Sequence, residues 1–167
     1  MMKILKSNGG FTLVELIVAM TIATVILTSV TAIFPAVLQT YEEANSLAER
    51  NTLMSNLANQ IIADLADATE DVAELDAENT VTIATGHGVV TYTVDALEGV
   101  LLKKIGSGEP AAVLSKAYFK NKSARFIVSK ADSHGTAYNL SVTIISDKSG
   151  KEISRNYTVM PLVLNQY

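Results

Sequence analysis

An apolar run near the N-terminus constrains this chain more than any other feature of its sequence. The 24 residues from Phe11 to Phe34 contain a single charged side chain, Glu15. At 1.5 Å per residue, a helix of this length is about 36 Å long and can cross the hydrocarbon core of a bilayer. The run therefore predicts a membrane-spanning helix and leaves the rest of the 167-residue chain for one further domain.

The residues on either side of this run predict whether the helix is retained and how it is oriented in the membrane. Lys3 and Lys6 precede it without any acidic residue, whereas Glu42 and Glu43 follow it. No small-residue cleavage site of the secretory type follows the run, so we expect the helix to be retained. By the positive-inside rule, these charges predict an N-terminus in the cytoplasm and an exported C-terminal part.

The segment from Gly10 to Glu15, with the sequence GFTLVE and an unbroken apolar helix behind it, closely resembles the processing signature of type IV pilins and pseudopilins. The resemblance consists of a short basic leader, Gly before Phe, and Glu at the fifth position after that junction. In this family a membrane peptidase cleaves between the Gly and the Phe and methylates the new N-terminus. The resemblance therefore implies that residues 1–10 are a leader, with cleavage between Gly10 and Phe11 and N-methylation of Phe11.

Glu15 is the charged side chain inside the apolar run. An ionised carboxylate at the centre of a bilayer costs roughly 2.5–3.5 kcal/mol on insertion scales, so its presence needs a reason. Cleavage would create an amine on Phe11, one helical turn away, and this amine could pair with Glu15 of its own chain or of an adjacent subunit. The resemblance implies the second arrangement and a role for Glu15 in filament assembly. One alternative stays open, in which Glu15 only reaches the membrane interface.

Pro35 follows the apolar run and lacks the N–H that a helix would direct to the carbonyl of Thr31. It predicts either a kink in a continuing helix or a helix that ends at the membrane surface. From Ala44 to Leu65, apolar residues recur every three or four positions, which indicates an amphipathic helix with one buried stripe. We therefore expect a transmembrane and assembly helix over residues 11–38, and an amphipathic helix with an acidic linker over residues 39–78.

Residues 79–167 have the composition of a β-rich globular head. Short runs of Val, Ile, Thr and Tyr alternate with Gly, Asp, Asn and Ser, as is typical of antiparallel strands joined by turns. Strands are expected at residues 81–84, 89–94, 100–105, 124–129, 138–145 and 153–160. The simplest packing lays one sheet on the amphipathic helix. The predicted fold class is thus α+β and pilin-like: a long membrane-spanning helix continues into an amphipathic stalk helix, which packs against an antiparallel β-sheet head.

Charge is distributed unevenly between these segments. Residues 42–78 carry ten acidic side chains and one basic side chain, whereas residues 100–155 carry ten basic and four acidic ones. Two interpretations stay open. The acidic stalk of one subunit could attract the basic head of a neighbour along a filament. Alternatively, both sets of charges only keep the surface soluble, since exposed ion pairs contribute little individually.

One stretch of the head interleaves basic and aromatic residues, which is the composition of a groove for single-stranded nucleic acid. Its candidate binding residues are Lys116, Tyr118, Lys120, Lys122 and Arg125. A strand at the edge of a sheet has the same composition, because lysines prevent edge pairing while aromatic side chains fill the core. The second interpretation is favoured, since no recognised nucleic-acid-binding module surrounds the stretch.

The sequence offers no support for catalysis or for a metal site. The chain has no Cys and two His, and it lacks a phosphate-binding loop, an H-E-x-x-H helix and a G-x-S-x-G turn. His87 lies between two glycines and His134 lies beside Gly135, so both are interpreted as turn residues. We therefore expect no catalytic residue, no bound metal and no cofactor.

Together these patterns predict a structural subunit of a type IV pilus or related filament. The lack of a Cys-closed C-terminal loop favours a minor pilin or a pseudopilin over a major pilin. The resemblance implies four partners, namely a prepilin peptidase, other pilin or pseudopilin subunits, an assembly platform in the cytoplasmic membrane, and the lipid bilayer. It also implies a single-pass protein of a bacterial or archaeal cytoplasmic membrane, with its N-terminus inside and its head outside, that reaches the cell surface or envelope in the filament. The alternative is a filament-tip binding module that contacts a surface, DNA or a secreted substrate.

Overall fold

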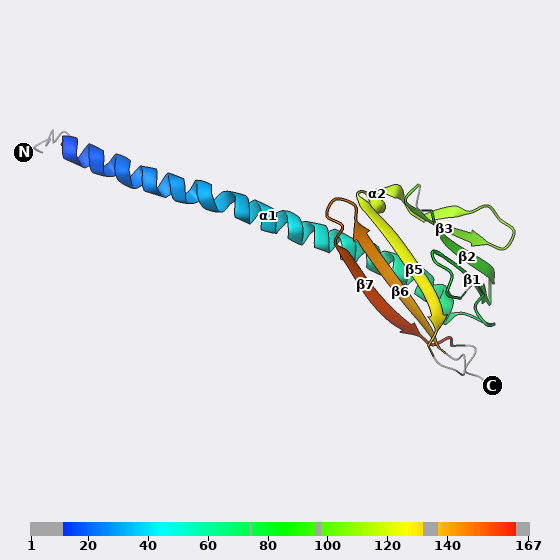
Figure 1. The fold of residues 1–167 in the computed structure, drawn as a ribbon. Coiled ribbons are helices and arrows are strands. Elements are labelled where there is room, and N and C mark those ends of the chain that lie inside the picture. Colours follow the sequence, from blue (N-terminus) through cyan, green and yellow to red (C-terminus); the bar gives the residue numbers. More distant parts are fainter. Residues whose placement is uncertain (1–11, 74, 96–97, 132–136, 163–167) are drawn as a thin grey trace, which may run out of the picture. The chain divides into compact units, whose positions relative to one another are not determined.

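The computed structural model describes residues 12–73, 75–95, 98–131 and 137–162. The chain divides into two compact units, Met1–Ser46 and Leu47–Tyr167. One helix, α1, extends over Leu13–Ala66 and contributes to both units (Figure 1). The second unit adds two antiparallel sheets and the short helix α2, Lys116–Phe119.

In the first unit, α1 is apolar and exposed. Its large hydrophobic side chains from Leu13 to Leu38 are between 45 and 75% exposed. Within the described residues, α1 is the helix that is long and apolar enough to cross a membrane, judged by length and composition. Pro35 lies inside α1, which continues unbroken to Ala66. The expectation of a helix that ends at the membrane surface is therefore wrong, while the kink at Pro35 stays a prediction.

In the second unit, the last part of α1 buries one face. The buried residues recur at helical spacing and are Arg50, Leu53, Met54, Leu57, Ala58, Ile61 and Leu65. The amphipathic stripe is thus confirmed from Met54 onward, but Ala44, Leu47 and Ala48 are exposed. Burial begins at Arg50 because the sheets reach only this far along the helix: the Arg50 guanidinium donates to the Lys151 carbonyl, in the turn between two strands, at 3.0 Å.

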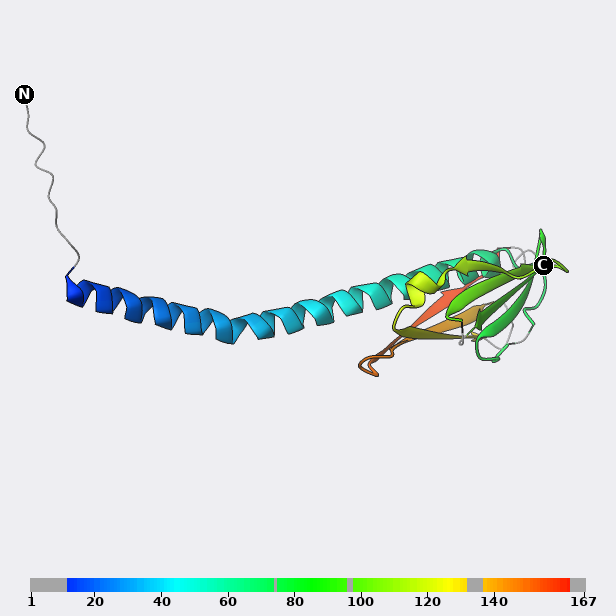
Figure 2. The same cartoon turned by 90° about the horizontal axis from the view of Figure 1, so that it is seen from above.

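The first sheet has the strand order β1-β2-β3-β4, formed by Thr80–Thr85, Gly88–Asp95, Val100–Ile105 and Ala111–Leu114. The second sheet has the order β5-β6-β7, formed by Lys122–Lys130, Tyr138–Ser146 and Glu152–Val159. In Figure 1, β5, β6 and β7 cross the C-terminal part of α1, and the first sheet lies to their right. In Figure 2 the green strands of the first sheet form a group separate from the orange and red strands of the second.

The α+β class is confirmed, with a long apolar N-terminal helix followed by antiparallel strands, but the expectation of one sheet is wrong. β4 pairs with β3 and is the edge strand of the first sheet. After the short helix α2, the chain enters β5, which pairs with β6 in the second sheet. Neither β4 nor α2 was expected, since the short segment AAVLSKAYF follows Pro110 and shows neither a clear alternation nor a helical period. Tyr92, Tyr138 and Phe126 are among the largest fully buried side chains of the shared core.

The acidic linker between α1 and β1 hydrogen-bonds to both sheets. The N–H groups of Thr69 and Ala73 donate to carbonyls of β1 at 2.8 and 2.9 Å. Those of Asp76 and Asn79 donate to carbonyls of β5 at 2.8 and 2.9 Å. The linker thus covers one edge of each sheet, and it packs with the head as part of the second unit. The domain bounds 11–38, 39–78 and 79–167 stay a prediction.

Asn79 has the most demanding position in this linker. Its φ is 64°, its Oδ1 accepts the Phe126 N–H at 3.2 Å, and its carbonyl accepts the Val94 N–H at 3.0 Å. We expect Asn79→Ala to lower the free energy of unfolding by about 2–3 kcal/mol, through left-handed strain and the lost hydrogen bond. Asn79→Gly, which tolerates this φ, should lose only about 1 kcal/mol. Urea unfolding of the full chain in detergent, monitored by the circular dichroism of its tyrosines, measures these losses. Equal losses in the two variants would contradict it.

Candidate functional site

The first turn of α1 holds Glu15 in a defined position. The N–H and the hydroxyl of Thr12 both donate to Glu15 Oε2, at 2.9 and 3.0 Å. The Glu15 N–H in turn donates to Thr12 Oγ1 at 3.2 Å. This reciprocal pattern is a capping box, in which Thr12 is the N-cap and Glu15 satisfies the N-cap amide. The sequence prediction treated Glu15 only as a charge, although the T-x-x-E spacing already signals this cap.

The cap uses one carboxylate oxygen of Glu15 and leaves the other available. No residue within the described ranges donates a hydrogen bond to Glu15 Oε1, and the side chain is exposed. A carboxylate in this state can cap its own helix and accept a cationic donor at the same time. Gly10 and Phe11, the expected cleavage and methylation positions, lie outside the described residues.

The hydroxyl side chains of the apolar run are satisfied inside the helix. Beyond Thr12, each one donates to the carbonyl one turn back, at 2.7–3.0 Å, and these residues are Thr21, Thr24, Thr28, Ser29 and Thr31. In a bilayer no water is present to bond these groups, so internal hydrogen bonds remove the penalty of placing them in lipid. The threonine content of the run is therefore compatible with a membrane span.

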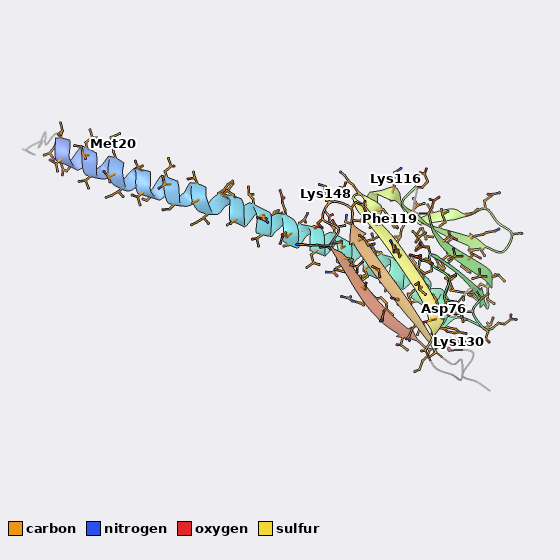
Figure 3. All side chains as sticks on the ribbon, viewed as in Figure 1. Met20, Asp76, Lys116, Phe119, Lys130 and Lys148 are labelled. Carbon is orange, nitrogen blue, oxygen red and sulfur yellow. The ribbon has the colours of Figure 1, made fainter. Side chains whose placement is uncertain are left out.

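The candidate binding patch follows α2 and the beginning of β5. Lys116 and Tyr118 are exposed on α2, Lys120 lies in the turn after it, and Lys122 and Arg125 are on β5. In Figure 3, Lys116 lies near Phe119 at the end of the second unit opposite Lys130. β5 forms one side of its sheet, and Phe119 and Phe126 are buried. These are features that the edge-strand interpretation predicts.

Three basic residues of this patch are paired with acidic residues of the same chain. Lys122 Nζ lies 2.8 Å from Glu49, and its side chain is only 9% exposed. Arg125 Nε lies 3.4 Å from Glu78, and the exposed Lys116 Nζ lies 3.6 Å from Glu98. An anionic ligand would have to compete with these acids for the same cations. Binding by the patch stays a prediction.

Part of the uneven charge of the chain is paired within one molecule. Four ion pairs connect acids of α1 and the linker to bases of the sheets: Glu49 with Lys122, Asp64 with Lys103, Asp71 with Lys130, and Glu78 with Arg125. Their closest N–O distances range from 2.7 to 3.4 Å. The acidic stalk and the basic head thus attract each other inside one chain, which neither sequence interpretation anticipated.

In two of these ion pairs, the acid also accepts a hydrogen bond from a buried tyrosine. The Tyr92 hydroxyl donates to Asp64 Oδ2 at 2.6 Å, and Lys103 Nζ lies 2.7 Å from the same oxygen. The Tyr138 hydroxyl donates to Asp71 Oδ1 at 3.2 Å. Burial, followed by the hydrogen bond to Asp64, raises the pKa of Tyr92 above its ordinary value. Burial also raises the pKa of Tyr138. The Tyr92 cluster connects the first sheet to α1, and the Tyr138 cluster connects the second sheet to the linker.

These raised pKa values predict a loss of stability at alkaline pH. A tyrosine in the unfolded chain has a pKa of 10.0, so above that pH the unfolded state binds fewer protons than the folded state. The free energy of unfolding should then fall by up to about 1.4 kcal/mol per pH unit for each tyrosine. Urea unfolding between about pH 9 and 11 measures this slope, which should be shallower in Tyr92→Phe. A slope unchanged by that substitution would contradict the assignment.

The described part of the chain contains no group of three or more His, Cys, Asp or Glu side chains that could hold a metal ion. His87 is exposed in the turn between β1 and β2, as expected of a turn residue. His134 lies outside the described residues.

Comparison with known families matches the N-terminal part of this chain. Residues 5–31 fit the model of the prokaryotic N-terminal methylation motif, and this range includes the segment from Gly10 to Glu15. No curated protein and no solved structure matches the chain. The motif supports a precursor of the type IV pilin or pseudopilin type, and the α+β architecture of the chain fits that of a pilin. Such a motif is typical of structural, membrane-anchored proteins.

Proposed function

We propose that this chain is a structural subunit, of the minor pilin or pseudopilin type, in a type IV pilus or a related filament. The observation that carries the proposal is an exposed apolar helix whose first turn holds Glu15 in a capping box, inside the matched methylation motif. An apolar surface of this extent needs a cover. The bilayer covers it before assembly, and the corresponding helices of other subunits cover it in the filament.

The sequence signals give the order of events. Lys3 and Lys6 keep the leader in the cytoplasm, where a prepilin peptidase cleaves between Gly10 and Phe11 and methylates the Phe11 amine. Glu15 keeps its helix cap through Oε2 and offers Oε1 to the Phe11 amine of an adjacent subunit. The assembly platform in the cytoplasmic membrane then extracts the subunit, and a kink at Pro35 lets the helix adapt to the filament.

The predicted orientation can be tested directly because the chain contains no Cys. We expect Lys148→Cys, in the turn between β6 and β7, to react with a membrane-impermeant maleimide when the cytoplasmic membrane is intact. Lys6→Cys, in the uncleaved precursor of a peptidase-deficient strain, should react only after the membrane is permeabilised. Labelling of Lys6→Cys before permeabilisation, with protection of Lys148→Cys, would reverse the orientation.

The alternative, a filament-tip module that binds through the patch from Lys116 to Arg125, has weaker support. Lys122 and Arg125 are already paired with Glu49 and Glu78. Loss of binding without loss of filaments in Lys120 and Lys122 variants would favour this alternative.

A further inference from the structure

The outer face of the second sheet, turned away from α1, has an unusual composition. Residues at alternate positions of β5, β6 and β7 align in four rows across the strands. Eight of these twelve side chains are Ser, Thr or Asn. The two central rows are Arg125-Thr143-Ser154 and Ile127-Ser141-Asn156. The two outer rows are Ser123-Ile145-Glu152 and Ser129-Asn139-Thr158. We call these four rows the hydroxyl face.

The hydroxyl face is hollowed at its centre. A shallow depression of about 220 Å³ is lined by the row Arg125-Thr143-Ser154, by Ile127 and Ser141 of the next row, and by Phe126 and Glu152. The Thr143 and Ser154 hydroxyls are hydrogen-bonded to each other across the strands at 2.8 Å. Of the polar residues that line the depression, Ser141 makes no side-chain hydrogen bond to the described part of the protein. Polar groups that point into an open depression without a protein partner are available to a ligand.

The charge of this face argues against an ionic ligand. Its charged side chains are Arg125 and Glu152, which have opposite signs, and Arg125 is already 3.4 Å from Glu78. A nucleic acid would require an excess of basic residues. The centre of a protein interface is usually apolar and aromatic. Among the described residues of this face, Ile127 is the one large apolar side chain that is exposed, at 38%.

We propose that the hydroxyl face binds a neutral polysaccharide. Hydroxyl and amide side chains can donate to and accept from sugar hydroxyls, and Ile127 offers an apolar contact for the C–H side of a sugar ring. The strands lie about 4.8 Å apart, so each row places hydroxyl or amide groups at regular intervals across the sheet. Such repetition lets weak contacts add up along an extended polymer. This activity does not depend on filament assembly and goes beyond the function proposed above.

The test is retention of the purified full chain, in detergent micelles, on cellulose, chitin and cross-linked dextran. We expect retention on at least one of the three, and no loss when salt is raised from about 0.05 to 0.5 M, because the ligand is neutral. Thr143→Val with Ser154→Ala should weaken the retention about tenfold, as expected for the loss of two hydrogen bonds to a ligand.

A matched control is present on the first sheet. Thr82 and Thr91 form the same kind of hydroxyl pair, 3.1 Å apart, across β1 and β2. Thr82→Val with Thr91→Val should leave the retention unchanged. If the Thr143 and Ser154 variant does not fold, Ser141→Ala replaces it, with an expected weakening of about threefold. Absence of retention on all three polymers, loss of retention at high salt, or an equal loss in the control would each overturn the proposal.

Discussion

Replacing Glu15 by Ala is expected to remove almost all of this chain from filaments while its amount in the membrane stays the same. The substitution deletes both the cap on Thr12 and the carboxylate that we propose to bind the Phe11 amine of an adjacent subunit. A charge-assisted hydrogen bond contributes about 1.5–3 kcal/mol, which corresponds to a 10- to 100-fold loss of incorporation. Quantification of the chain in sheared filaments and in membranes measures this loss.

Glu15→Gln separates the two roles of the side chain. Gln can also complete a capping box, because its side-chain oxygen still accepts from Thr12, but it carries no charge. If the carboxylate binds an amine between subunits, the Gln variant should be lost from filaments to nearly the same extent as the Ala variant. Incorporation of Glu15→Gln at the wild-type level would show that the cap alone matters, and the proposed contact between subunits would be wrong.

Replacing Asp64 by Ala is expected to have the largest effect on the stability of the second unit. Asp64 Oδ2 accepts the Tyr92 hydroxyl at 2.6 Å and pairs with Lys103 at 2.7 Å. Its loss leaves a half-buried ammonium without its partner and removes one of the two acceptors of a buried hydroxyl. We expect the free energy of unfolding to fall by about 3 kcal/mol, within the range for breaking a buried polar network.

Glu98→Ala provides the control for this prediction. Glu98 also pairs with a lysine, Lys116, but at 3.6 Å and with 69 and 75% of the two side chains exposed. Exposed pairs of this kind contribute little, so the variant should unfold at the same urea concentration as the wild type. Urea unfolding of both variants in the full chain tests the comparison. If Asp64→Ala were as stable as Glu98→Ala, the Tyr92 cluster would not hold the first sheet to α1.

The helix and most strands could be predicted from local patterns. The apolar run and the 3–4 spacing around Leu57 and Ile61 report on burial at short range, and alternation locates β2 and β6. The segment from Ala111 to Phe119 carries no such pattern, so β4, α2 and the division into two sheets were missed. The linker was expected only as an acidic segment after the amphipathic helix. Its role between β1 and β5 depends on backbone hydrogen bonds that no side-chain pattern encodes.

The features of the candidate site could also be predicted only in part from the sequence. Glu15 could be found because a charge in an apolar run is rare, and its cap on Thr12 was encoded in the T-x-x-E spacing, although it was not predicted. The pairing of Lys122 with Glu49 and of Arg125 with Glu78 joins residues far apart in the sequence. The basic and aromatic stretch therefore resembled a free cationic patch until the fold placed acids beside it.

The most direct test of the account is mass spectrometry of the N-terminus of this chain in sheared surface filaments and in the membrane fraction. The account predicts that the chain in filaments begins at a methylated Phe11, and a minor subunit should be present there in small amounts. A chain that retains Met1 in the membrane and is absent from filaments would contradict the account.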